Sequence, residues 1–146
     1  MRIDKPPLFP RFDGQAHRLI ALRSTASDTV TAWVEDDFHH FGVQVSHVDN
    51  VIIDISVRAK RFPYTSCGGA EQSARELIGA PLAPRASDVG RWISMRHQCT
   101  HLYDLLGLAR AHPSLKREPR QYLTIIDDRR VLDVDVSGRR TFEPRR

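Results

Sequence analysis

The densest group of chemically reactive side chains lies in residues 97–112, with the sequence HQCTHLYDLLGLARAH. His97 and His101 are four positions apart, so on a helix they share one face and could meet one metal ion or one substrate. Zinc proteases carry a similar histidine pair, but Gln98 stands where those enzymes need a glutamate base, which argues against metalloprotease chemistry.

The first turn of this segment is the part expected to form one wall of a site. Cys99 lies about 200° around a continuous helix from His97, so the two side chains do not chelate one ion easily. A helix that begins near Cys99 or Thr100 would instead present free backbone N–H groups to an anion. In the alternative interpretation, Cys99 is a small buried core residue and His97 and His101 lie at the surface or are hydrogen-bonded.

A second group of reactive side chains occupies residues 35–40, with the sequence EDDFHH. Acids and histidines together supply proton donors and acceptors near neutral pH, so Glu35 and His39 are candidate catalytic residues. Carboxylates are also common at solvated hairpin ends, which is the alternative interpretation of this segment.

A third group lies in residues 61–70, with the sequence RFPYTSCGGA. Gly68 and Gly69 precede a predicted helix, and free amides at such a helix end suit an anion or an oxyanion. Tyr64 could act as an acid or a hydrogen-bond donor, Arg61 could bind an anionic group, and Cys67 could line the same site. The alternative is an ordinary strand-to-helix loop with a helix cap.

Composition sets the protein class. The 146 residues are 40% hydrophobic and 27% charged with a net charge of +4, which indicates one globular domain with a mildly basic surface. No apolar run reaches the roughly 20 residues of a membrane span, and the N-terminus does not resemble a signal peptide, so a cytoplasmic location with Cys67 and Cys99 reduced is expected. The sequence contains no dinucleotide-binding glycine motif, P-loop, Gly-x-Ser-x-Gly or Cys-x-x-Cys motif, which disfavours nucleotide cofactors, serine-hydrolase chemistry and a closed structural zinc site.

The pattern of hydrophobicity predicts an α+β fold with an antiparallel sheet and two to three helices packed on one face. Short connections predict a four-stranded meander over residues 16–23, 29–34, 40–48 and 51–57. Helices are expected over 70–78, from 87 or 88 onward, and over 99–112, where Pro113 should end the last one. A final hairpin is expected from 121–126 and 130–136. The single domain, 1–146, then comprises an irregular arm (1–14), the meander (15–60), a helical part (61–112) and the hairpin (121–136).

Several of these residues together resemble a known family. They are Arg61-x-Pro63, Cys67, Leu77-Ile78-Gly79, Cys99-Thr100-His101-Leu102 and Asp104-Leu105. Over roughly residues 15–112 the chain resembles a bacterial family catalogued as domain of unknown function 2889, which implies a shared site rather than a particular reaction. The order of elements is also similar to the NifU-like iron–sulfur scaffold fold, with Cys67 and Cys99 matching in kind, which implies a similar architecture.

The leading functional hypothesis is a small bacterial enzyme without a cofactor. It would perform acid–base chemistry of the lyase or hydratase type on a small polar or aromatic substrate, as in the catabolism of aromatic compounds. His101 or His39 would be the base, and Tyr64 or Glu35 the donor or orienting group. The substrate would be bound by Arg61, Cys99, Thr100 and Cys67.

Two further hypotheses stay open. One is a zinc or iron site with Cys67, Cys99, His101 and either His39 or an acid as ligands. The other is a non-catalytic binding or assembly module. Nucleic-acid binding is less favoured, because the basic residues do not form one stripe with interleaved aromatic residues. The sequence is compatible with a homo-oligomer and indicates no membrane partner.

Overall fold

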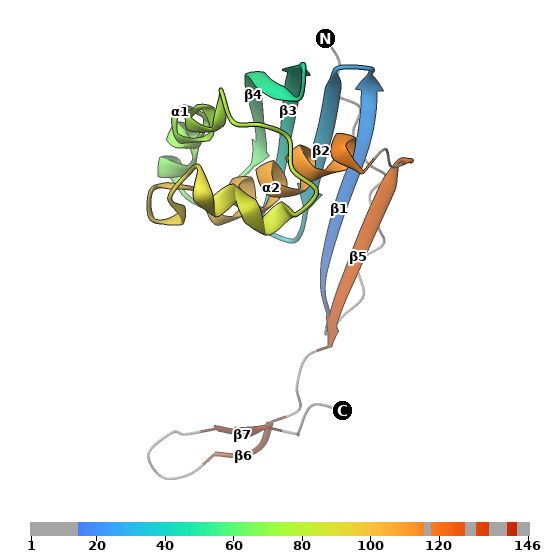
Figure 1. Cartoon of the computed structure of the whole chain (residues 1–146). Coiled ribbons are helices and arrows are strands. Elements are labelled where there is room, and N and C mark those ends of the chain that lie inside the picture. Colours follow the sequence, from blue (N-terminus) through green and yellow to red (C-terminus); the bar gives the residue numbers. More distant parts are fainter. Residues whose placement is uncertain (1–14, 116–117, 128–130, 135–139, 143–146) are drawn as a thin grey trace.

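The main sheet of the protein is antiparallel and has five strands (Figure 1). In a computed structural model, which describes residues 15–115, 118–127, 131–134 and 140–142, the strand order is β4-β3-β2-β1-β5. The bounds are β1 (Gln15–Ala26), β2 (Thr29–Glu35), β3 (His40–Val48), β4 (Val51–Arg61) and β5 (Arg120–Asp127). The predicted meander and the α+β class are therefore confirmed.

The β3–β4 hairpin shows how local sequence sets the strand register. Asp49 and Asn50 both have positive φ angles, of 49° and 64°, as a two-residue turn of type I′ requires. Asp and Asn tolerate this region better than most residues, and the turn pairs Val48 with Val51. Because side chains alternate across a strand, this register places Val43, Val45 and Ile55 in the core.

Short helical segments join the sheet to one long helix. They are η1 (Thr65–Gly69), α1 (Ala70–Ala74), η2 (Arg75–Leu77), η3 (Ala86–Arg91) and η4 (Met95–His97), followed by α2 (Thr100–Ser114). The predicted helix over 70–78 is thus one α-helical turn continued as a 3₁₀ turn. The helix predicted to begin at residue 87 or 88 is a single 3₁₀ segment, and it begins at Ala86.

The expected end of the last helix at His112 is wrong, because α2 continues through Pro113 to Ser114. A proline this close to the C-terminus removes only one backbone hydrogen bond. Ala111 and His112 are buried, and the N–H of Leu115 bonds to the carbonyl of Ala111, so packing keeps the last turn helical.

Helix α2 crosses one face of the sheet and forms the centre of the core with β2 and β3 (Figure 1). Leu102, Leu105, Leu106 and Ala109 are completely buried, and burial of one leucine side chain stabilises the fold by about 1.5–3 kcal/mol. None of the helices in the described ranges has the length and apolar character that a membrane crossing needs.

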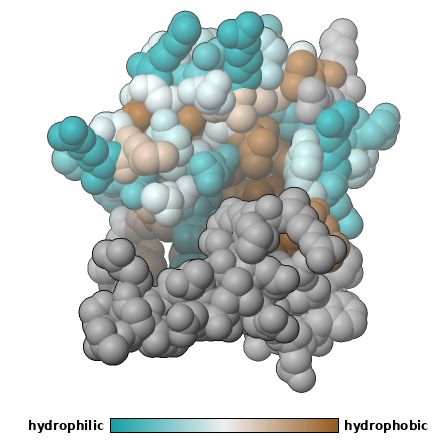
Figure 2. Space-filling view, turned by 90° about the horizontal axis from the view of Figure 1, so that it is seen from below, coloured by the Kyte–Doolittle hydropathy of each residue, from teal (hydrophilic) through white to brown (hydrophobic). Residues whose placement is uncertain are grey.

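The predicted pairing of 121–126 with 130–136 is wrong, although both segments contain strands. β5 lies along β1 instead, from Gln15 opposite Asp127 to Leu22 opposite Arg120, and β6 (Val131–Val134) pairs with β7 (Arg140–Phe142) as the C-terminal strand pair. The free edge of β1 offers eight residue pairs to β5, which is more than a short local hairpin provides. β5 leaves apolar side chains exposed, among them Leu123, Ile125 and Ile126. Seen from below, the molecule shows apolar surface between hydrophilic flanks (Figure 2).

Candidate functional site

The candidate site begins at the turn that joins β2 to β3. Asp36 closes this turn, because one of its carboxylate oxygens, Oδ1, accepts the N–H groups of Phe38 (3.0 Å) and His39 (2.8 Å). The N–H of Asp36 in turn donates to the carbonyl of His39 at 2.9 Å. Aspartate favours such turns because its short side chain reaches the backbone two or three residues ahead. The carboxylate of Asp36 is therefore held in place by its own turn.

His39 is oriented by this carboxylate. Its Nδ1 lies 2.9 Å from Oδ1 of Asp36, and its side chain is 17% exposed. An ionised carboxylate only accepts hydrogen bonds, so Nδ1 of His39 is the donor. Among the described residues Nε2 of His39 has no hydrogen-bond partner, and it is not one of the buried polar atoms. The second ring nitrogen is therefore not fully buried and has no protein partner among these residues.

Arg18, on β1, completes the charge balance of Asp36. Its Nη2 and Nε donate to Oδ2 of Asp36 at 2.8 Å and 3.2 Å. Burial by itself would raise the pKa of Asp36, but the hydrogen bonds from His39, Arg18 and the backbone amides of His39 and Phe38 outweigh it and lower that pKa below its ordinary 3.8. Asp36 is therefore an anion at neutral pH.

His101, in the first turn of α2, stacks on His39. The two ring centroids are 3.8 Å apart with an interplanar angle of 29°. Nη2 of Arg18 lies 3.2 Å from Nε2 of His101, and because a guanidinium only donates, Nε2 accepts and the ring proton resides on Nδ1. That nitrogen lies 4.0 Å from Sγ of Cys99.

His101 is held in its neutral form. Burial lowers its pKa below the ordinary 6.5, and repulsion from the protonated form of His39 and from Arg18 lowers it further, against the opposite effect of Asp36 and Asp104. Its basic nitrogen already accepts a hydrogen bond from Arg18. The histidine with a nitrogen available to a substrate is therefore His39.

Glu35 and Arg61 form a second ion pair beside the turn. Nη2 of Arg61 donates to Oε1 of Glu35 at 3.3 Å and to the backbone carbonyl of Asp36 at 2.6 Å. Nδ1 of His40 lies 3.8 Å from the same carboxylate oxygen. Arg61 therefore supports the turn that carries Asp36, and its predicted role in binding a substrate anion stays a prediction.

The structure brings only some of the predicted site residues together. His39, His101 and Cys99 are adjacent, and Thr100 is the exposed first residue of α2, with Cys99 as its N-cap. Tyr64 is 70% exposed, and Cys67 packs against the core. Within the described part of the chain, no hydrogen bond, ion pair or ring contact joins either of them to His39 or His101.

Sequence reasoning missed Arg18, and it named Asp36 only as part of the 35–40 cluster. The signal for Arg18 was the short β1–β2 connection. That turn pairs Leu22 with Ala32 and Leu19 with Glu35, so extending the register by one residue places Arg18 opposite Asp36. Antiparallel neighbours at this position are close enough for an ion pair.

Asp36, His39 and His101 are also a possible set of metal ligands. Their donor atoms all lie within 4.8 Å of one another, and imidazole with carboxylate suits zinc or iron. Neither Cys67 nor Cys99 belongs to this group. The donor types fit, but the two rings lie nearly parallel, and Arg18 bonds to both Asp36 and His101. An ion would therefore have to displace the guanidinium of Arg18.

Comparison with known proteins identifies a family. A family model described as protein of unknown function (DUF2889) matches residues 17–112, about two thirds of the chain. The matched range contains Arg18, Asp36, His39 and His101. No curated protein and no solved structure matches the chain. The similarity of element order to the NifU-like fold therefore stays a prediction.

Proposed function

The chain belongs to the DUF2889 family, which assigns no activity, and we propose from the site itself that the protein is an acid–base catalyst with His39 as general base. The observation that carries this proposal is the 2.9 Å contact between Nδ1 of His39 and Oδ1 of Asp36, which leaves Nε2 without a partner among the described residues and not fully buried. A carboxylate on one nitrogen of a histidine fixes the ring and stabilises the imidazolium that forms when the other nitrogen takes a proton.

Each neighbour of His39 has a role in this chemistry. The ring of His101 stacks on that of His39 and keeps it in one orientation, so His101 is a positioning residue. Arg18 uses Nη2 and Nε for Asp36, which leaves Nη1 to bind an anionic or carbonyl oxygen of a substrate. Phe38 is exposed, and its ring lies edge-on to His39, which suits an aromatic substrate.

The reaction class that we propose is a lyase or hydratase reaction. Nε2 of His39 would remove a proton from a carbon next to a carbonyl group, and the C–H electron pair would form a C=C bond as a hydroxyl group leaves from the neighbouring carbon. The imidazolium would return the proton to that hydroxyl, which departs as water. Arg18 would stabilise the negative charge that develops on the carbonyl oxygen. Such a step needs no cofactor, and we place it in the bacterial cytoplasm.

The test compares His39→Gln with the matched variant His97→Gln. Both replace a histidine, but His97 is exposed in η4 and, within the described ranges, makes no side-chain contact with Asp36, His39 or His101. Purified proteins are incubated with a panel of aromatic and aliphatic β-hydroxycarbonyl compounds, and the absorbance of the conjugated product is followed. Loss of a general base should lower turnover by roughly 10²–10⁴-fold, while His97→Gln should retain it. Equal turnover by the two variants, or no turnover of any panel member, contradicts the proposal.

A metal centre is the second candidate, and the convergence of donor atoms from Asp36, His39 and His101 favours it. The ion would be zinc or iron. Elemental analysis of protein purified without a histidine tag tests this candidate. A metal content below about 0.1 equivalents excludes a real site, whereas one equivalent that disappears in His101→Ala supports it. A non-catalytic assembly module predicts instead that replacing Cys99 and His101 together abolishes partner binding.

A further inference from the structure

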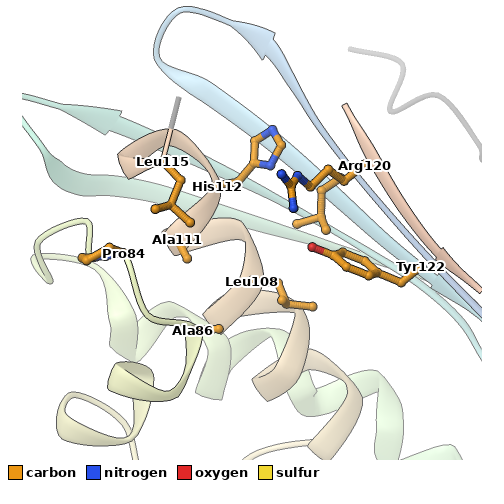
Figure 3. Close-up of a pocket in the computed structure, with 9 residues that line it drawn as sticks. Pro84, Ala86, Leu108, Ala111, His112, Leu115, Arg120 and Tyr122 are labelled. Carbon is orange, nitrogen blue, oxygen red and sulfur yellow. The ribbon is translucent and has the colours of Figure 1, made fainter. Parts of the chain in front are cut away.

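A second concave site lies near the opposite end of α2 from His101. A cavity of about 150 Å³ opens between the C-terminal half of α2, strands β1 and β5 and the segment around Pro84 (Figure 3). His112, which lines it, follows His101 by eleven helical residues, and this corresponds to about 16 Å along the helix axis. The cavity is therefore distinct from the Asp36–His39–His101 cluster.

Six of the nine residues that line this cavity are apolar. Leu22 lies on β1. Leu108 lies on α2, Leu115 directly follows that helix, and Pro84 lies in the loop before η3 (Figure 3). A cavity of roughly this size lined by apolar side chains holds a benzene-sized molecule. The apolar part of a ligand would therefore be no larger than one six-membered ring.

Polar groups gather at one side of the same cavity. Arg120 and Tyr122 alternate along β5, opposite Leu22 and Ile20 of β1, so both lie on the face of the sheet that α2 covers. Figure 3 shows their polar ends and the ring of His112 directed toward one region. His112 is 3% exposed, whereas Arg120 and Tyr122 remain accessible.

The guanidinium of Arg120 is available to a ligand. Within the described ranges it forms no ion pair with any carboxylate. A guanidinium binds a carboxylate through two parallel hydrogen bonds, and a tyrosine hydroxyl can donate a third. Inorganic anions would satisfy these donors but would leave the apolar walls without contacts.

We propose that this cavity binds a small aromatic monocarboxylate of the size of benzoate. The ring lies among Leu22, Leu108 and Leu115, and the carboxylate pairs with Arg120 and accepts a hydrogen bond from Tyr122. This site is independent of the proposed catalysis, because it shares no residue with the histidine cluster.

Binding is measured by NMR, in titrations of the ¹⁵N-labelled protein with benzoate and, separately, with benzyl alcohol as the uncharged probe. Benzoate should cause saturable shifts at the amides of Leu108 and Tyr122. Arg120→Gln should weaken benzoate binding roughly tenfold or more, because it removes a charge-assisted hydrogen-bond donor, and should leave the weaker binding of benzyl alcohol unchanged. Arg58→Gln, which replaces an exposed arginine on β4, should not change either affinity.

A second variant tests the apolar part of the site. Leu108→Trp adds a larger side chain at the cavity wall and should abolish binding of both probes, while circular dichroism verifies that the protein is folded. Three results would each overturn the proposal. They are the absence of saturable shifts in the wild-type protein, equal benzoate affinities of Arg120→Gln and Arg58→Gln, and shifts centred on His39 and His101. The last of these results would locate the carboxylate in the catalytic cluster and leave the proposed function standing.

Discussion

Removal of the charge of Asp36 should destabilise the protein far more than removal of an ordinary surface charge. Among the described residues, its side chain accepts five hydrogen bonds, from two backbone amides, the ring of His39 and two nitrogens of Arg18. It is only 12% exposed. Asp36→Asn keeps the shape of this side chain and changes only its charge and one acceptor atom.

The magnitude follows from the bonds that asparagine can and cannot make. The amide oxygen of asparagine can still accept the N–H groups of Phe38 and His39, so the turn remains. The amide nitrogen would face the guanidinium of Arg18, and because both groups are donors, the two hydrogen bonds from Arg18 are lost. The hydrogen bond from His39 remains but is no longer made to a charged acceptor. Because Arg18 is 42% exposed, its share is discounted for solvent screening. The loss of unfolding free energy is therefore about 2 kcal/mol.

Urea denaturation at neutral pH measures this loss. With a denaturant dependence typical of small domains, about 2 kcal/mol corresponds to a midpoint lower by roughly 1 M urea. Asp54→Asn is the matched control, because Asp54 is 53% exposed and is paired with Arg75 at 3.3 Å. That variant should lose less than about 1 kcal/mol. Equal midpoints for the two variants would show that the bonds to Asp36 do not hold the site together.

The pH dependence gives the same prediction an independent readout. The pKa of Asp36 is lowered in the folded state, so its contribution is fully present above the unfolded value of about 3.8 and is lost as pH falls through the lower folded value. The stability difference between wild type and Asp36→Asn should therefore stay constant near neutral pH and shrink below pH 4. A difference that grows on acidification would refute the assignment of Asp36 as an anion.

Three further predictions concern stability. Gly107→Ala should cost about 1–3 kcal/mol, since a Cβ at Gly107 would lie 2.6 Å from the backbone oxygen of Ala86; a calorimetric melting temperature checks this. Gly79→Ala should cost about 1–2 kcal/mol because its φ is +92°, whereas Gly69→Ala, which has open space, should change little in the same assay. The lowered pKa of His101 means that the folded state resists protonation, so wild-type stability should fall as pH drops below 6.5; His101→Gln should flatten that decline in denaturation curves measured across pH, and an unchanged slope would contradict it.

The sheet and the helix could be predicted because their signals are local. The Asp49–Asn50 turn and the alternation of residues 40–48 specify the β3–β4 hairpin, and the apolar spacing of Leu102, Leu105 and Leu106 specifies the buried face of α2. The continuation of α2 through Pro113 was not predictable in this way. It depends on the burial of residues that contact other elements, and local rules do not contain that information.

The candidate site was predicted in part for a similar reason. His39 and His101 stand in short motifs with recognisable chemistry, but the structure adds a stacking contact between residues 62 positions apart in the sequence. Arg18 belongs to no motif, and only the β1–β2 register reveals its place. Tyr64 carries suitable chemistry, yet it stands in a loop whose direction the sequence does not fix, and it is exposed.

Pairing of β5 with β1 has the largest functional consequence among the features that the sequence did not indicate. Leu22 lies opposite Arg120, and this register turns Arg120 and Tyr122 toward α2. A shift of one residue would direct both side chains to the other face of the sheet and remove the guanidinium and the phenol hydroxyl from the cavity. The Asp36–His39–His101 cluster itself contains no residue of β5, which lies beyond the residues 17–112 that the family model matches. Only Arg18 of its neighbours is paired with β5, opposite Thr124. Arg120 is paired with Leu22 and not with Arg18. Arg120→Gln should therefore alter benzoate binding without altering the turnover that we propose, so the two proposed sites can be tested separately.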